Sequence, residues 1–289
     1  MENGRGLNEF MQFVIEDVEK YKDNYKPVKA SILERLLRKK ANPSSLHPNF
    51  EDEFSIPGIG PNFEIIGDYK NEIITTAHMV GLMFPQAIIV EKMKPEGFLI
   101  INGHHRWAAA KQMGLKAMKV KVVNLVHKED IERMRELCGK EKAVAFDLDE
   151  VVFSNEEGKM EEALPFPKNK QFTERIRKGI PKIFRALKEK GYDIWVYTSG
   201  YGSEEYIRKL LTNYDAEPAG IINGFGEKRT KEQKEMVKEL MDSYKEKMHI
   251  DIGGVVVTHP DSKEYQHLEV KENGSEWSEE ILGIIKNLK

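Results

Sequence analysis

Short apolar runs alternate with amphipathic stretches throughout the second half of the sequence. The apolar runs predict strands at residues 143 to 147, 192 to 197, 220 to 222 and 248 to 252. The stretches between them have helical periodicity and predict helices at about 176 to 190, 203 to 212 and 230 to 247. This order is typical of a parallel sheet with helices on both faces, whose ligands bind beyond the carboxyl ends of the strands.

The first half has a different pattern. Apolar runs at 87 to 90 and 98 to 101 are separated by a polar stretch and predict a β-hairpin. A glycine-led turn at 102 to 106 follows. Residues 107 to 113 are strong helix formers and predict a helix, and residues 119 to 126 predict a strand. Together these elements predict a compact β-β-loop-α-β unit.

Three segments lie upstream of this unit. Residues 7 to 22 predict an amphipathic helix, and residues 28 to 40 fit a helix and an edge strand equally well. Residues 47 to 62 are too rich in Pro and Gly for a regular element and predict a loop.

The length of 289 residues fits two domains of ordinary size. A charged helix at 127 to 142 breaks at Gly139, just before the next buried strand begins. We therefore expect an α/β protein with one domain at 1–138 and a second at 139–289.

Composition limits the partners and the cellular compartment that we expect for this protein. The 48 acidic and 45 basic residues give a net charge of -3, so there is no global attraction to DNA or an anionic membrane, although local patches remain open. The single cysteine, Cys138, excludes an internal disulfide framework and suits a reducing compartment. The sequence shows neither a signal segment nor an apolar run long enough to span a bilayer. We expect a soluble, cytoplasmic protein with no membrane partner.

The predicted strand at 143 to 147 ends in Asp147, and Asp149 comes two residues later. Period-two alternation aims Asp147 and Asp149 to the same side. Two such carboxylates can bind a divalent cation, and one can attack phosphorus while the other handles the leaving-group proton. Thr198 follows the next strand and can hold a phosphoryl group, and Asp251 ends the last strand as a third metal ligand. The predicted chemistry is phosphoryl transfer assisted by Mg²⁺.

A cation must also balance the phosphate charge at such a site. Lys228 or Lys231 precedes the last strand at a suitable distance, and Lys234 is a further alternative. Ser199, beside Thr198, completes the predicted phosphate-binding set of Thr198, Ser199 and Lys228.

These parts, in this order, resemble the haloacid dehalogenase (HAD) superfamily of phosphatases and phosphotransferases over about residues 141 to 289, with Phe146-Asp-Leu-Asp-Glu-Val-Val152 as the most specific motif. The resemblance implies a Rossmannoid domain in which Asp147 is the nucleophile that forms an aspartyl-phosphate and Asp149 is the general acid and base. It also implies that Thr198 and Lys228 bind phosphate and that Asp251 joins Asp147 in holding magnesium.

One departure from that family concerns the last strand. The family often has paired acids there, whereas Ile252 follows Asp251 in this sequence, so that Asp261 is an alternative source of the missing group. The short spans between Asp147, Thr198 and Lys228 leave little room for a separate cap domain, which predicts an open site.

The turn Asn102-Gly-His-His-Arg106 lies between a predicted strand and a predicted helix. Backbone N–H groups and the helix dipole favour an anion at such a place, and Arg106 adds a bidentate donor for phosphate oxygens. His104 or His105 can donate hydrogen bonds or move a proton near neutral pH. The turn therefore predicts a phosphate site formed by Asn102, Gly103, His104, His105 and Arg106.

Residues 30 to 126 resemble the ParB/sulfiredoxin superfamily, on the stretch from Phe98 to Val123 and more weakly through Leu46-His-Pro-Asn49. The resemblance implies an α+β domain that binds a nucleotide such as ATP, ADP or CTP. Sulfiredoxin chemistry is not expected, because histidines stand where those proteins carry a reactive cysteine. The serine-kinase branch uses an acidic base near the start of the domain, for which Glu51, Asp52 and Glu53 are candidates, with a solvated acidic loop as the alternative.

Three functions follow from these patterns. The first is a magnesium-dependent phosphatase that acts through an aspartyl-phosphate, coupled to a nucleotide-binding or phosphate-binding domain. The second is a kinase in the first domain, which uses ATP or ADP on a small hydroxyl substrate while the second domain trims a phosphorylated product. The third is a nucleic-acid or nucleotide sensor joined to a phosphatase. The expected partners are a phosphorylated small molecule or nucleic-acid end, and a nucleotide.

Overall fold

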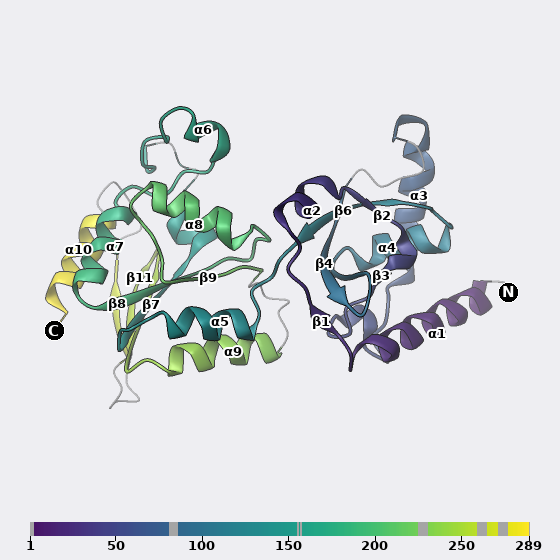
Figure 1. Cartoon of the computed structure of the whole chain (residues 1–289), viewed down its shortest axis with the longest axis horizontal. Helices are drawn as coiled ribbons and strands as arrows, with labels where there is room; N and C mark the ends of the chain where they lie inside the picture. The colour runs from purple at the N-terminus through teal and green to yellow at the C-terminus, as the bar shows by residue number, and fades with distance from the viewer. Residues whose placement is uncertain are drawn as a thin grey trace. The chain divides into compact units, whose positions relative to one another are not determined.

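The computed structural model describes residues 3–80, 86–154, 156, 158–224, 231–258, 265–270 and 277–288. The chain forms two compact units, residues 1 to 124 and residues 125 to 289, and both combine helices with a sheet (Figure 1). The fold is thus mixed α/β. In the described part of the chain, no helix is both long and apolar enough to cross a bilayer.

The first unit has a sheet with strand order β2-β6-β4-β5-β3, and β1 pairs antiparallel with the C-terminal end of β4. Its strands are β1 (Lys26–Pro27), β2 (Lys40–Ala41), β3 (Leu46–His47), β4 (Ile88–Lys94), β5 (Phe98–Asn102) and β6 (Met118–Val123). Its helices are α1 (Asn3–Tyr21), α2 (Ile32–Leu37), α3 (Phe63–Val80) and α4 (His104–Gln112). The predicted hairpin is β4 and β5, and the predicted helix after the glycine-led turn is α4.

Trp107 is at the centre of the core of the first unit. This side chain is fully buried on α4, packs against Phe10 and Phe13 of α1, and donates a hydrogen bond from Nε1 to the carbonyl of Pro43 at 2.8 Å. Burial of a large aromatic ring with its one polar atom satisfied stabilises the contact between α1, α4 and the loop before β3.

The second unit has a sheet with strand order β12-β11-β10-β7-β8-β9. Its strands are β7 (Lys142–Asp147), β8 (Tyr192–Tyr197), β9 (Gly220–Ile222), β10 (Glu246–Asp251), β11 (Gly254–Thr258) and β12 (Tyr265–Glu269). Its helices are α5 (Lys128–Glu136), α6 (Lys168–Gln171), α7 (Ile180–Glu189), α8 (Glu204–Asn213), α9 (Lys231–Asp242) and α10 (Trp277–Asn287). Strands β10, β7, β8 and β9 are parallel, as the sequence predicts, whereas β11 and β12 add an antiparallel edge.

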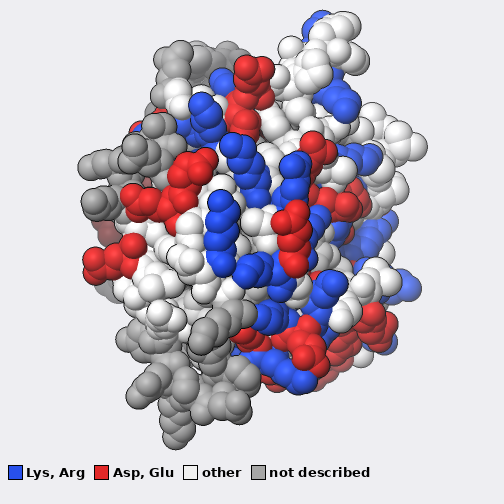
Figure 2. All heavy atoms as spheres, turned by 90° about the vertical axis from the view of Figure 1, so that its left-hand side faces the viewer, with Lys and Arg blue, Asp and Glu red and all other residues white. Residues whose placement is uncertain are grey.

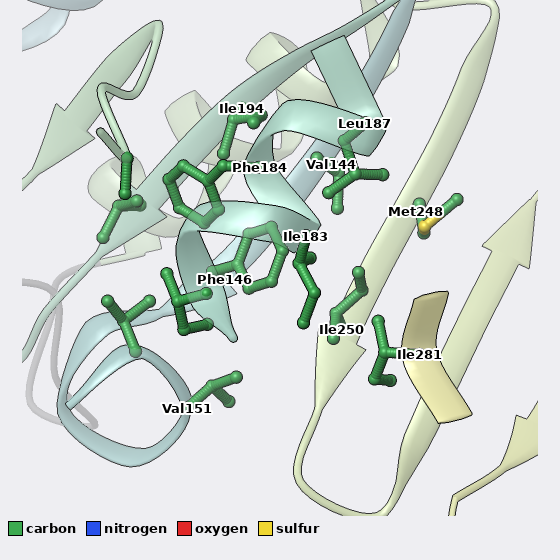
Figure 3. Packing of buried hydrophobic residues seen from close by; sticks show 14 of the residues in the cluster. Val144, Phe146, Val151, Ile183, Phe184, Leu187, Ile194, Met248, Ile250 and Ile281 are labelled. Carbon is green, nitrogen blue, oxygen red and sulfur yellow. The ribbon is translucent and has the colours of Figure 1, made fainter. Parts of the chain in front are cut away.

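The two faces of this sheet carry separate cores. Alternate residues such as Val144, Phe146 and Ile250 pack against α7 and α10 in the larger core (Figure 3). The rings of Phe146 and Phe184 meet there with centroids 5.1 Å apart. On the opposite face, Trp195 packs with residues of α5 and α9. Helices thus cover both faces of the sheet.

Helix α5 belongs to the second unit. Its residues Ile131 and Met134 are buried in the same cluster as Ala143 and Trp195. The structural boundary therefore lies before α5, at 124/125, whereas the sequence prediction placed it after this segment, at 138/139. The break at Gly139 marks a turn between α5 and β7 within one core.

Charge is mixed on one face of the second unit. Figure 2 shows that Lys and Arg side chains lie among Asp and Glu side chains on the face it presents. This face thus lacks the single-sign field that steers binding to a nucleic-acid backbone.

Packing of α7 on the sheet gives a test of the larger core. Ile183 is fully buried. We expect Ile183→Ala to lower the free energy of unfolding by about 2 to 5 kcal/mol, because it removes apolar contacts and leaves a cavity. Urea denaturation followed by circular dichroism measures this loss. Lys182→Ala, at the exposed neighbouring position on the same helix, should change stability by no more than about 0.5 kcal/mol; a loss of similar size in both variants would contradict the packing.

Candidate functional site

Asp147 is the last residue of β7, a central strand between β10 and β8. Its backbone is in register with Tyr197, the last residue of β8. Val144 and Phe146 point into the core beneath α7, so alternation places Asp147 on the other side of the strand, at its carboxyl end. This is the edge of a parallel sheet where ligands bind.

A π-helical turn, Leu148–Val152, follows Asp147 directly. Asp147 Oδ1 accepts hydrogen bonds from the backbone N–H groups of Asp149 at 2.7 Å and Glu150 at 2.9 Å, and so caps the turn. From the other side, the guanidinium of Arg177 donates to the carbonyls of Val151 at 2.8 Å and Glu150 at 3.0 Å. Such turns are rare and are frequently found at functional sites.

The turn aims Asp149 at the end of the neighbouring strand. The Thr198 hydroxyl donates to both carboxylate oxygens of Asp149, at 2.8 and 2.9 Å. Ser199 donates to Asp149 Oδ2 from its backbone N–H and its hydroxyl, both at 2.8 Å. The structure thus brings together Asp149, Thr198 and Ser199. Asp149 reaches them from the π-helical turn, and the strand alternation that the sequence suggested for it is wrong, since β7 ends at Asp147.

Asp251, at the end of β10, contributes a further negative charge. Burial raises the pKa of Asp147, backbone hydrogen bonds lower it in part, and the charges of Asp149 and Asp251 raise it further. Burial lowers the pKa of His249, two residues before Asp251, while the charges of Asp251 and Asp147 act in the opposite direction. Two carboxylates from β7 and β10 therefore share one electrostatic environment.

Magnesium fits the chemistry of these donors but only part of the predicted ligand set. Mg²⁺ takes oxygen ligands and keeps several waters, so that one or two carboxylates suffice. The charge of Asp251 acts on Asp147, so these two are the carboxylates that a cation could bind. Within the ranges that the structure describes, however, no three His, Cys, Asp or Glu side chains are grouped closely enough to hold one ion. Asp149 is instead turned toward Thr198 and Ser199.

Two predicted residues lie outside the described part of the chain. These are Lys228, the expected phosphate ligand, and Asp261, the alternative metal ligand. Helix α9 begins at Lys231, whose side chain is likewise not described.

The raised pKa of Asp147 predicts how stability depends on pH. In the unfolded chain this carboxyl loses its proton at its ordinary pKa of about 4, whereas the folded protein retains the proton to a higher pH. Ionised Asp147 therefore costs stability above that window. We expect Asp147→Asn, which keeps an oxygen to cap the turn, to raise the melting temperature near pH 7, and the gain should shrink as the pH falls below about 4. Differential scanning fluorimetry across this pH range measures the effect. A melting temperature that falls near pH 7 would contradict it.

In the first unit, Gly103 joins β5 to α4. It is the N-cap of α4, with φ 103° and no side chain to cap the helix. A Cβ atom at this position would lie 2.5 Å from Ile88 Cγ2, which is closer than non-bonded atoms approach. Both the left-handed backbone and the contact with Ile88 therefore require glycine here.

The two histidines of the turn face the loop at 47 to 62. His104 Nε2 accepts the backbone N–H of Asn49 at 3.1 Å, and its Nδ1 lies 3.6 Å from Asp52 Oδ2. His105 Nε2 accepts the backbone N–H of Asn62, also at 3.1 Å. His104 is 5% exposed, and its ring stacks on Phe54. Both imidazoles thus hold the loop against α4, a structural role that the turn sequence alone did not reveal.

The guanidinium of Arg106 contacts the residues just before β4 and the last residue of β5. It donates to the carbonyl of Ala87 at 3.2 Å, and to side-chain oxygens of Gln86 and Asn102 at 3.4 Å. These contacts are long for charge-assisted hydrogen bonds. Arg106 and Asn102 therefore lie together at the carboxyl end of β5, beside the positive end of α4.

Of the three acidic candidates in the loop, Asp52 lies beside the turn. Its Oδ2 faces His104, and its Oδ1 accepts the backbone N–H of Phe54 at 3.0 Å. Glu53 is exposed. The negative charge of Glu51 acts on Tyr25, whose pKa is raised chiefly by burial and next by the charge of Glu91.

Comparisons with known proteins bear mainly on the first unit. A model of the ParB N-terminal domain matches residues 69–135, which include the turn at 102 to 106 and continue into α5. No curated protein matches the chain. Among solved structures, a mutant free serine kinase in complex with AMP has 14% sequence identity over 85% of this chain and 82% of that chain, with a TM-score of 0.23. Neither match supports a HAD fold for the second unit.

Proposed function

We propose that this chain is a phosphoryl-transfer enzyme whose reacting carboxylate is Asp147. The observation that supports this best is the meeting of two carboxylates and two hydroxyls, from Asp147, Asp149, Thr198 and Ser199, at the carboxyl ends of adjacent parallel strands. In the comparisons nothing supports a HAD assignment, so the proposal rests on the residues and their geometry.

Asp147 acts first in this proposal. A carboxylate oxygen of Asp147 forms a bond to phosphorus while the ester P–O bond breaks, and the leaving oxygen takes a proton from Asp149. Water then attacks phosphorus of the aspartyl-phosphate and gives its proton to Asp149, which releases phosphate and restores Asp147. A magnesium ion held by Asp147 and Asp251 would neutralise charge on the phosphoryl oxygens.

Thr198 couples substrate binding to proton transfer. Its hydroxyl is committed to Asp149 in this structure. A phosphoryl group that takes this hydroxyl as a donor removes its shared hydrogen bond from both oxygens of Asp149 and leaves that carboxyl able to exchange a proton with the leaving group. Binding of phosphate and readiness of the acid are thereby linked through one side chain.

Phosphate release tests the assignment of Asp147. Across a panel of nucleotides, phosphosugars, phosphoserine and phosphorylated oligonucleotides with magnesium, we expect the wild-type chain to release phosphate and Asp147→Asn to lose at least about a thousandfold in rate, because the amide is a poor nucleophile. A malachite-green assay measures it. The matched control is Glu150→Gln in the same turn. Glu150 contributes to the turn through its backbone N–H and carbonyl, so the rate of this variant should stay within a few-fold of wild type. Equal rates for wild type and Asp147→Asn would overturn the assignment.

We also propose that the first unit binds the phosphate groups of a nucleotide at the turn 102 to 106. The match of residues 69–135 to the ParB N-terminal domain supports this, since it contains the whole turn. The uncapped positive end of α4 and the guanidinium of Arg106 supply the attraction for an anion. A kinase that uses ATP or ADP on a small hydroxyl substrate is the corresponding activity, with Asp52 as the acidic group beside the turn.

Nucleotide affinity tests the turn. Loss of a charge-assisted hydrogen bond costs roughly 1.5 to 3 kcal/mol, so we expect Arg106→Ala to weaken binding of ADP or ATP about ten- to a hundredfold in isothermal titration calorimetry. Lys116→Ala, an exposed lysine between α4 and β6, is the charge-matched control and should bind as wild type does. If both variants bind equally, Arg106 does not contact the nucleotide.

A further inference from the structure

Helix α2, Ile32–Leu37, presents its apolar side to solvent. Ile32, Leu33, Leu36 and Leu37 are 60%, 68%, 60% and 75% exposed, and no residue of this helix is buried. Their spacing of one and four residues places all four side chains on one side of the helix. A contiguous apolar face on the surface of a soluble protein marks an interaction site more often than isolated exposed residues do.

The polar side of α2 is the side that holds it to the first unit. The carboxylate of Glu34 lies 2.7 Å from Lys92 Nζ on β4 and is 18% exposed, and Ser31 caps the helix by accepting the N–H of Glu34. An ordinary surface helix turns its apolar face inward. This helix is inverted, and the ion pair between Glu34 and Lys92 lies on the side that faces the sheet.

Basic residues flank α2 on both sides in the sequence. Between residues 26 and 41 the chain carries six basic residues and a single acidic one, Glu34. The exposed members of the basic set are Lys26, Lys29, Arg38, Lys39 and Lys40. Glu34 is already paired with Lys92 and Arg38. The stretch from 26 to 41 is thus strongly positive, even though the whole chain is slightly acidic.

This charge pattern selects the partner. Two copies of the same face brought together would place like charges opposite each other, which opposes a symmetric dimer. Nucleic-acid backbone offers negative charge but no apolar layer for four leucine and isoleucine side chains. An anionic lipid surface offers both, because apolar side chains enter the acyl boundary while Lys and Arg reach the phosphate level.

We infer that α2 and its basic surroundings form a docking face for an anionic lipid bilayer, into which Ile32, Leu33, Leu36 and Leu37 insert. Attachment is peripheral and reversible, since one short helix buries few side chains. The face would bring the first unit, with its phosphate-binding turn, to a membrane surface independently of the activity of Asp147.

Vesicle flotation with the full-length chain tests this inference. We expect the protein to float with vesicles that contain about 30% phosphatidylglycerol and to remain unbound with pure phosphatidylcholine, and binding should fall in about 0.5 M salt because screening weakens the attraction. Leu33→Ser combined with Leu37→Ser should reduce the bound fraction at least about tenfold, and so should Lys39→Glu combined with Lys40→Glu.

Matched controls separate the face from general effects. Leu137→Ser changes another highly exposed leucine, 85% exposed, in the second unit, and Lys188→Glu with Lys209→Glu reverses two exposed lysines there. Both controls should float as wild type does, and all variants should keep the wild-type melting temperature. Absence of flotation, equal binding to neutral vesicles, or equal loss in the controls would overturn the inference. So would a dimer in light scattering that Leu33→Ser with Leu37→Ser dissolves.

Discussion

The hydrogen bonds that Asp147 accepts from the turn that follows it are the interaction on which the geometry of the site depends. One oxygen of this carboxylate accepts two backbone N–H groups and so starts the π-helical turn at the end of β7. Arg177 closes the turn from the opposite side through two carbonyls. The turn then delivers Asp149 to Thr198 and Ser199. Asp147 at the strand end thus fixes its own position and, through the turn, the position of Asp149.

The same arrangement leaves negative charge concentrated. The charges of Asp149 and Asp251 both raise the pKa of Asp147, as does its burial, and its two backbone hydrogen bonds offset these effects only in part. At such a site the ionised carboxylate is unfavourable. A cation that binds beside it, or an electrophile that reacts with it, would neutralise its negative charge and so bind more favourably. Functional sites often carry strain of this kind, which the surrounding core must outweigh.

Much of the second unit could be predicted from sequence, because strands buried on both faces give nearly continuous apolar runs. Strands β7, β8 and β9 lie at the predicted places, and Thr198 follows β8 as expected. The hairpin of β11 and β12 and helices α3 and α10 were not anticipated. Nor could local patterning show that Asp149 leaves the strand, since one-dimensional alternation carries no sign of a π-helical turn.

Residues with two chemically reasonable roles were the harder problem, and the turn of the first unit shows why. Imidazoles beside a helix N-terminus can bind an anion or accept hydrogen bonds from backbone N–H groups of a neighbouring loop. Only the folded chain shows that the N–H groups of Asn49 and Asn62 donate to His104 and His105. Helix α2 presents the same difficulty in reverse, because its amphipathic sequence predicts an inward apolar face, whereas in the structure Glu34 meets Lys92 and the apolar side chains are exposed. In both places the contacts between residues far apart in the sequence, which periodicity does not show, determine which side chains stay available to a ligand.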